Sequence, residues 1–117
     1  MVRTMVMPRV LKEDKNDAGK LTYRLLSNGH WEAWEYNDKG LEVRHVYPTH
    51  WVAFEYDDKD RVVRTSRSTG SWMRCKYNAQ GLKTYEETSS GNWSKFEYDD
   101  NGVLINTTHN PRNAPKY

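Results

Sequence analysis

The sequence predicts an all-β protein: an antiparallel meander of about nine or ten short strands, built from repeats of about twenty residues, in a twisted and curved sheet that is open or curled on itself. Tryptophans recur in steps of 20, 21 and 21, at Trp31, Trp51, Trp72 and Trp93, and tyrosines keep the same steps, at Tyr36, Tyr56, Tyr77 and Tyr98. Clusters of Asn, Asp, Ser and Gly recur about every ten residues. Between them, β-branched and aromatic residues dominate, and no stretch has a helical period.

The repeats set the expected organisation of the chain. We expect one domain over residues 1–108 and a C-terminal tail over residues 109–117. The repeats lie near residues 10–19, 20–40, 41–60, 61–81 and 82–102. The first repeat lacks aromatic residues, as is common for a terminal repeat whose outer side meets water. Residues 1–11 are expected to form an edge strand, with Pro8 where its missing N–H does no harm.

Each complete repeat is expected to contain two strands and two turns. The first strands are predicted over residues 21–26, 41–47, 61–65, 82–87 and 103–107, and the short turns after them over 27–29, 48–50, 68–70 and 90–92. Each second strand runs from the repeated tryptophan to the repeated tyrosine. The turns that close the second strands read N-D-K-G, D-D-K-D, N-A-Q-G and D-D-N-G, a composition that favours hairpin loops.

Alternation along the second strands assigns side chains to two faces. One face is expected to be a core face and carries Trp34, Phe54, Cys75 and Phe96 with the four repeated tyrosines, Val52 and Met73. The opposite face carries the four repeated tryptophans Trp31, Trp51, Trp72 and Trp93, which we call the Trp ladder. Its charged neighbours on the same face are Glu35, Glu55, Arg74, Lys76 and Lys95.

Two interpretations of the Trp ladder remain open at this stage. In the structural one, each ring lies across a neighbouring strand and covers its backbone and the stems of Arg or Lys. In the functional one, the rings form a stacking surface for sugar rings, nucleobases or the apolar side chains of a partner.

Composition excludes several classes of protein. The chain of 117 residues suits one domain, and its net charge of +2 argues against a strongly basic nucleic-acid surface. Cys75 is the only cysteine, so we expect no intramolecular disulfide and no thiolate metal cluster. No apolar run is long enough to span a membrane, and no signal peptide is recognised. We therefore expect a cytoplasmic protein.

Catalytic and metal-binding residues are not expected. His30 and His50 occupy the same repeat position, directly before Trp31 and Trp51, which indicates a role in the turn. His45 is expected on the apolar side of its strand. The acidic turns lack the spacing of a calcium loop, and no nucleophile or phosphate-loop motif occurs. Because catalysis needs unlike groups that converge once, whereas this chain repeats one surface, we expect a protein without enzymatic activity or cofactor.

The unit G-x-W-x-x-F-E-Y-D-x-x-G-x-L at residues 91–104 resembles the YD repeats of the RHS type. The Tyr-Asp pair is kept at Tyr56 and Tyr98 and becomes Tyr-Asn at Tyr36 and Tyr77. The likeness covers about residues 10–108 and implies a β-meander; in that family, long arrays form a shell around a partner polypeptide, and some members are linked to carbohydrate binding. A weaker likeness is to aromatic cell-wall-binding repeats, which bind choline or glycans.

From these observations we expect a non-enzymatic binding protein whose repeated aromatic surface docks a macromolecule, above all another protein. Its size suits an inhibitor or adaptor, such as the small viral proteins that phages use against host defence. An alternative is a carbohydrate-binding module that stacks sugars on the Trp ladder. A third is a single-stranded nucleic-acid binder, whose positive charge would come from Arg24, Arg44, Arg64, Arg74 and Lys95. Self-association through a sheet face or edge is also expected.

Overall fold

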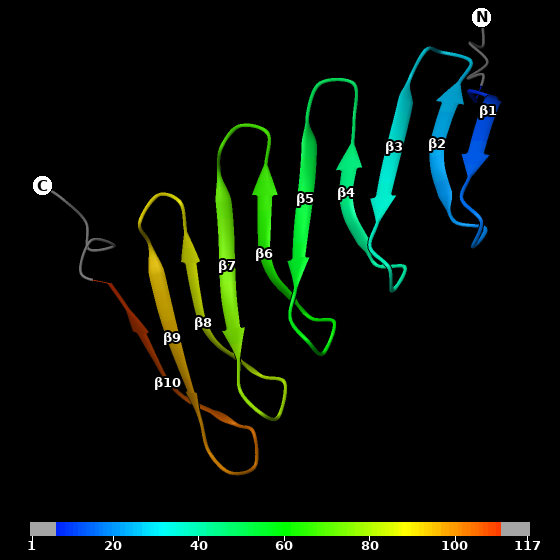
Figure 1. Ribbon diagram of the computed structural model, residues 1–117. Helices are drawn as coiled ribbons and strands as arrows, with labels where there is room; N and C mark the ends of the chain where they lie inside the picture. Colours follow the sequence, from blue (N-terminus) through cyan, green and yellow to red (C-terminus); the bar gives the residue numbers. More distant parts are fainter. Residues whose placement is uncertain (1–6, 111–117) are drawn as a thin grey trace, which may run out of the picture. The chain divides into compact units, whose positions relative to one another are not determined.

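The computed structural model describes residues 7–110, which form ten β-strands and no helix. The strands follow one another in the sheet in sequence order, and the neighbouring pairs with a defined register are antiparallel (Figure 1). The strands are β1 (Val10–Lys15), β2 (Leu21–Leu26), β3 (Trp31–Tyr36), β4 (Glu42–Val46), β5 (Trp51–Tyr56), β6 (Val62–Arg67), β7 (Trp72–Tyr77), β8 (Lys83–Thr88), β9 (Trp93–Tyr98) and β10 (Leu104–His109). The predicted all-β meander is confirmed.

The chain divides into two compact units, Met1–Ala53 and Phe54–Tyr117, which we call unit 1 and unit 2. Their boundary falls inside β5. The expected end of the domain at residue 108 lies one residue short of the end of β10 at His109. Of the rest of the expected tail, Asn110 is described and its backbone N–H donates to the carbonyl of Trp93 at 3.2 Å, whereas residues 111–117 lie outside the described residues.

The N-terminal edge strand differs from the prediction over residues 1–11. Residues 1–6 lie outside the described part of the chain, and residues 7–9 are not in a strand. The first strand, β1, begins at Val10 and pairs with β2 through Val10 and Leu26. Pro8 stands two residues before it, which is consistent with a residue that cannot donate to a strand ladder.

The long turns, which join each second strand to the next first strand, are closed by the Asn or Asp side chain that opens them. Oδ1 of Asn16 accepts hydrogen bonds from the backbone N–H groups of Ala18 (3.0 Å) and Lys20 (2.9 Å). The same two bonds recur at Asn37, Asp57, Asn78 and Asp99. This repeated Asx turn confirms the local role that the sequence assigns to these residues.

The fourth residue of each long turn adopts a positive φ, which only glycine adopts without steric cost. Glycine fills this position in four of the five turns, with φ between 82° and 84°. The fifth turn has Asp60, with φ 63°; among the described residues it is the only non-glycine with a positive φ.

The short turns explain why one repeat is a residue shorter than the others. The turns over residues 26–30, 67–71 and 88–92 are each closed by a backbone hydrogen bond between first and last residue, of 2.8 to 2.9 Å. In the remaining one, the N–H of Tyr47 donates to the carbonyl of His50 at 2.7 Å, and the loop contains Pro48 in place of glycine. The step of 20 from Trp31 to Trp51 comes from this shorter loop.

A β-bulge follows four of the long turns. The register shifts by one residue opposite the end of the preceding strand, so that one extra residue stands at the start of the next strand. The extra residues are Thr22, Val43, Thr84 and Ile105. The sequence analysis did not predict these bulges, and they decide which face a first-strand side chain reaches.

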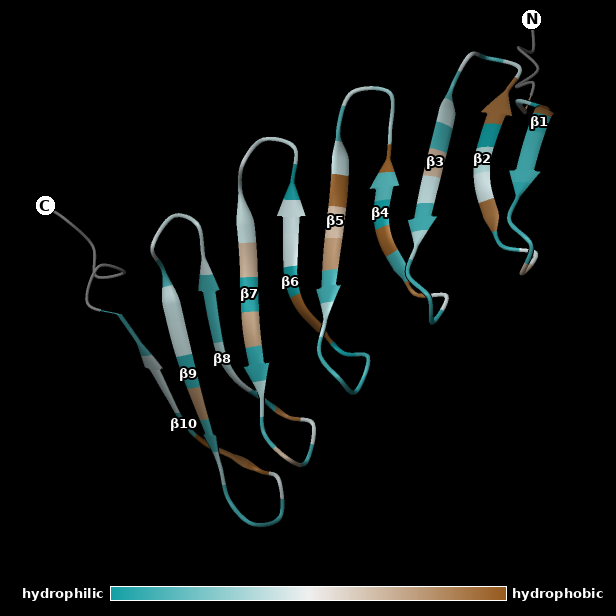
Figure 2. Ribbon diagram, in the orientation of Figure 1, coloured by the Kyte–Doolittle hydropathy of each residue, from teal (hydrophilic) through white to brown (hydrophobic). Residues whose placement is uncertain are grey.

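The predicted core face is not buried. Within residues 7–110 no hydrophobic side chain is buried, and only Ser94 (9% exposed) and Asn110 (3% exposed) are. Trp34, Phe54, Cys75 and Phe96 are half-buried, and Met73 is 44% exposed. Figure 2 shows short hydrophobic and hydrophilic bands alternating along the strands. Alternation identifies a face, but a core requires a second layer, and the described residues form only one sheet.

Candidate functional site

The Trp ladder lies half-buried on the second strands of both units. In unit 1, Trp31 on β3 stands opposite Leu25, and Trp51 on β5 stands opposite Val46. In unit 2, Trp72 on β7 stands opposite Ser66, and Trp93 on β9 stands opposite Glu87. Each ladder tryptophan is the first residue of its strand, as the sequence predicted.

A cation or a second ring stacks against each ladder ring in unit 1. Tyr23 on β2 stacks on Trp31, with ring centroids 6.3 Å apart and an angle of 25° between the planes. The guanidinium of Arg44 on β4 lies 4.8 Å from the ring centroid of Trp51. Arg44 also reaches Glu35 on β3, with its Nε 3.4 Å from the carboxylate. Arg44 thus joins a ladder ring to one of the predicted charged neighbours.

The ladder rings of unit 2 carry cations as well. The guanidinium groups of Arg64 and Arg74 lie 5.0 and 5.5 Å from the ring centroid of Trp72. The ammonium of Lys95 lies 5.3 Å from the ring centroid of Trp93. Contacts of this kind stabilise by about 0.5–1 kcal/mol when exposed, so they orient the rings more than they hold the fold together. Both units therefore place cationic side chains against ladder rings.

The predicted charged neighbours divide into ion-paired and unpaired groups. Glu55 pairs with Arg64 at 3.5 Å, and Arg74 pairs with Glu87 on β8 through Nε at 2.7 Å. Like Glu35 with Arg44, these are surface ion pairs of modest energy. Lys76 and Lys95 are exposed, and neither forms an ion pair within the described residues.

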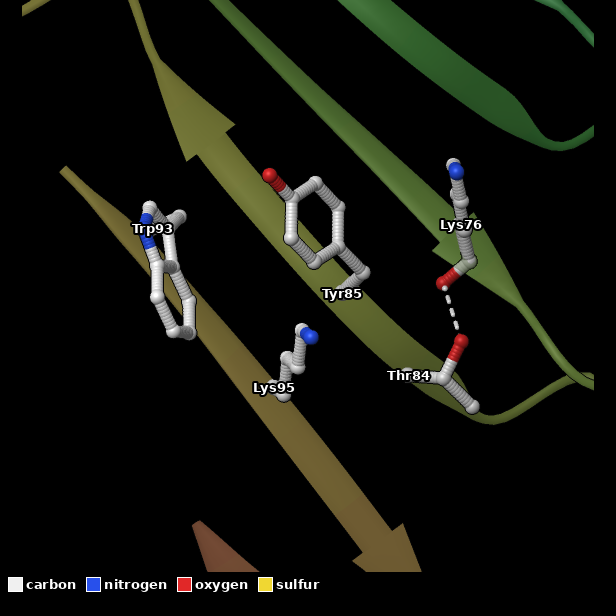
Figure 3. Close-up of a pocket in the computed structure, with 5 residues that line it drawn as sticks. All are labelled: Lys76, Thr84, Tyr85, Trp93 and Lys95. Carbon is white, nitrogen blue, oxygen red and sulfur yellow. Dashed lines mark hydrogen bonds between the residues drawn. The ribbon is translucent and has the colours of Figure 1, made fainter. Parts of the chain in front are cut away.

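An open pocket on the ladder side of unit 2 is lined by Lys76, Thr84, Tyr85, Trp93 and Lys95. Figure 3 shows Tyr85 on β8 between Lys76 on β7 and the two residues of β9. Sequence reasoning named Trp93, Lys76 and Lys95 but missed Tyr85 and Thr84. Tyr85 could have been found by comparing the repeats, because the same first-strand position carries Tyr23, Arg44 and Arg64.

The repeated tyrosines of the opposite face have a structural role. The hydroxyl of Tyr36 donates to the carbonyl of Leu21 at 2.6 Å, that of Tyr77 to Val62 at 2.8 Å, and that of Tyr98 to Lys83 at 2.5 Å. Each bond crosses to the start of the neighbouring first strand. The thiol of Cys75 lies 3.2 Å from the same Val62 carbonyl and 3.4 Å from the Tyr77 hydroxyl. Contact with this thiol, together with burial, raises the pKa of Tyr77 to about 12.

Three of the histidines gather on the opposite face of unit 1. The ring of His45 stacks on Tyr47 (centroids 4.2 Å apart), and Tyr47 stacks on His50 (4.5 Å). Nε2 of His45 lies 2.7 Å from Glu32, which His30 also approaches at 3.4 Å. His45 stands opposite Trp34, as its predicted face requires. Within residues 7–110 no cluster of His, Cys, Asp and Glu is arranged to hold a metal ion.

Comparisons with known proteins give no relative from which a function could be transferred: no family model matches the chain, and no curated protein matches it significantly. The resemblance to YD repeats and the weaker one to cell-wall-binding repeats therefore stay predictions. Among residues 7–110 there is also no helix of the length and apolar character that crossing a membrane requires.

Proposed function

We propose that this chain is a non-enzymatic binding protein that docks another protein on the Trp ladder. One observation carries the proposal: half-buried tryptophans recur at the same repeat position in both units, each stacked with Arg, Lys or Tyr. Trp, Tyr and Arg are the residues that most often carry the binding energy of protein interfaces.

The absence of a buried apolar core among the described residues supports the same proposal. A folded chain of this size normally covers its aromatic side chains with a second layer. Here the rings are half-buried on one sheet, so a partner can cover them and gain the free energy of removing apolar surface from water. The role of inhibitor or adaptor suggested by the size of the chain rests on this docking.

The experiment compares two double variants that differ in the face they alter. Trp51→Ala/Trp72→Ala truncates the ladder, and Trp34→Ala/Phe96→Ala truncates two half-buried rings of the opposite face. Both are checked for folding by circular dichroism and immobilised beside the wild type in a lysate. A polypeptide held by the wild type and by the opposite-face variant is purified and titrated against all three proteins. We expect the ladder variant to lose at least about 2 kcal/mol of binding free energy.

The two alternative functions, nucleic-acid binding and sugar binding, predict different results in the same capture experiment. Binding of a nucleic-acid strand weakens steeply with salt and is removed by nuclease, whereas stacking of a neutral sugar survives salt and is displaced by millimolar monosaccharide. We expect the captured polypeptide to resist all three treatments. The proposal fails if every polypeptide retained by the wild type is retained equally by the folded ladder variant.

A further inference from the structure

The pocket of unit 2 is the place where the chain departs from its own repeat. The fifth residue of the second strand is glutamate in three repeats, at Glu35, Glu55 and Glu97, and lysine at Lys76. The third residue of that strand is alanine at Ala33 and Ala53, arginine at Arg74 and lysine at Lys95. Lysine at the fifth position of one strand next to lysine at the third position of the following second strand therefore occurs only at Lys76 and Lys95.

These two lysines make one row of side chains across β7, β8 and β9 positively charged. Lys76 on β7 stands opposite Tyr85 on β8, and Tyr85 stands opposite Lys95 on β9. In the corresponding rows, Arg44 pairs with Glu35 at 3.4 Å and Arg64 pairs with Glu55 at 3.5 Å. Arg74, which stands opposite Arg64, pairs with Glu87 at 2.7 Å, so each cation of these rows has a carboxylate partner. Here two exposed ammonium groups flank an aromatic ring, and within residues 7–110 no carboxylate is ion-paired with either.

The two rings of the pocket are held in place by their neighbours. The hydroxyl of Tyr85 donates to Glu87 at 3.2 Å, and the guanidinium of Arg74 holds the same carboxylate oxygen at 2.7 Å. Burial and the Glu87 carboxylate raise the pKa of Tyr85, so the phenol stays a neutral donor. The ammonium of Lys76 lies 5.5 Å from the Tyr85 centroid, and that of Lys95 lies 5.3 Å from the Trp93 centroid. Each ammonium group therefore lies close to one of the two rings that line the pocket (Figure 3).

We propose that this pocket binds an acidic sugar, a pyranose ring that carries a carboxylate or sulfate group. The anionic group binds to the ammonium groups of Lys76 and Lys95, whose flexible side chains move off the rings of Tyr85 and Trp93, and the apolar face of the sugar ring stacks on the ring surface that they leave. The pocket shares Trp93 with the Trp ladder, but it also needs Lys76 and Lys95 together, a pair that no other repeat has. Either function can fail without the other.

The surroundings of the pocket favour a single ring with a local anion over a nucleic-acid strand. A strand carries a phosphate on every nucleotide and needs a continuous basic track. On β9, Glu97 follows Lys95 on the same face and is exposed, and on β8 the carboxylate of Glu87 lies beside Tyr85. These carboxylates would repel the phosphates on either side of the pocket, whereas one carboxylate or sulfate fits between the lysines.

The test uses defined oligosaccharides and variants taken from the chain's own repeats. A galacturonate tetrasaccharide, a sulfated galactan tetrasaccharide, neutral maltotetraose and a thymidine tetranucleotide are titrated while the indole N–H signal of Trp93 is followed by NMR. We expect at least one acidic sugar to bind and to shift this signal. Lys76→Glu, which restores the residue of the other repeats, should weaken that binding about tenfold or more, because it replaces an attractive charge by a repulsive one.

Lys59→Glu is the matched control, since it makes the same change of charge in an exposed long turn of unit 2. It should bind the acidic sugar like the wild type. Lys95→Ala, with the alanine found at Ala33 and Ala53, should weaken binding as well. The proposal is overturned if neither acidic sugar binds, if maltotetraose or the tetranucleotide binds as tightly, or if Lys59→Glu weakens binding as much as Lys76→Glu. Comparing the two acidic sugars identifies the preferred anion.

Discussion

At the scale of single residues, Asp60 is the one residue other than glycine that has a positive φ within residues 7–110. It holds φ 63° at a turn position where four other repeats have glycine. We expect Asp60→Gly to raise the free energy of unfolding by about 0.5–1 kcal/mol, because the left-handed conformation costs a residue with a side chain free energy that glycine does not lose. Asp60→Ala keeps the Cβ and should lower the free energy of unfolding. Urea unfolding measures both, and a destabilised Asp60→Gly variant would contradict the explanation.

The hydroxyl of Tyr77 gives a second prediction at this scale. Its bond to the Val62 carbonyl should make Tyr77→Phe less stable than the wild type by about 1 kcal/mol near pH 7. The pKa of Tyr77 is raised from 10.0 to about 12, so the folded state favours the neutral phenol. This contribution is complete below pH 10 and is lost as the pH rises through 12. Urea unfolding between pH 8 and pH 12 should show the difference between the two proteins shrinking; a constant difference would contradict the assignment.

At the scale of the elements, a turn opened by Asp57 should lose stability in acid, whereas the equivalent turns opened by Asn37 and Asn78 should not. The backbone N–H of Arg61, and then that of Lys59, lowers the pKa of Asp57 below its usual 3.8 by hydrogen bonding to the carboxylate. The stabilisation that this pKa shift provides is present when the pH is above the usual pKa of 3.8, and it is lost as the pH falls through the lowered pKa of Asp57. Asp57→Asn carries the residue of the equivalent turns at Asn37 and Asn78, so it should keep the turn and lose the pH dependence.

Thermal unfolding at pH 7 and pH 2.5 checks this prediction. Between the two pH values, Tm should fall less for Asp57→Asn than for the wild type. Asp57→Ala removes both side-chain hydrogen bonds to the backbone and should lower Tm at both pH values. Equal acid sensitivity of the wild type and Asp57→Asn would show that other carboxylates control the acid response.

The elements also show which features of the fold the sequence determines locally. Strand and turn positions were predictable because Asn, Asp and Gly fix each turn through bonds within five residues, as at Asn16. The bulge at Thr84 was not predictable, because it depends on the register between β8 and the neighbouring β7. The rings of the Trp ladder were predictable from their period. Tyr85 has no constant residue type at its repeat position, which carries Tyr23, Arg44 and Arg64 in the other repeats, so only an alignment of the first strands would have found it.

The predicted core failed at a larger scale. The aromatic period of Trp34, Phe54 and Phe96 is the same whether a second layer covers that face or water does. Burial depends on what packs against the sheet, which no repeat motif specifies. The half-exposed rings of both faces are therefore a property of the assembled sheet and could not be derived from any one repeat.

For the molecule as a whole, this exposure predicts unusual unfolding thermodynamics. The heat-capacity change of unfolding follows the apolar surface that unfolding exposes, and within residues 7–110 no hydrophobic side chain is buried. We expect calorimetry to give a change well below the usual value of about 12–15 cal/mol/K per residue. The transition should also be broad, because each repeat contacts mainly its neighbours. An ordinary heat-capacity change, with a Tm that rises with protein concentration, would contradict this and would show that copies of the chain cover each other's sheet faces in solution.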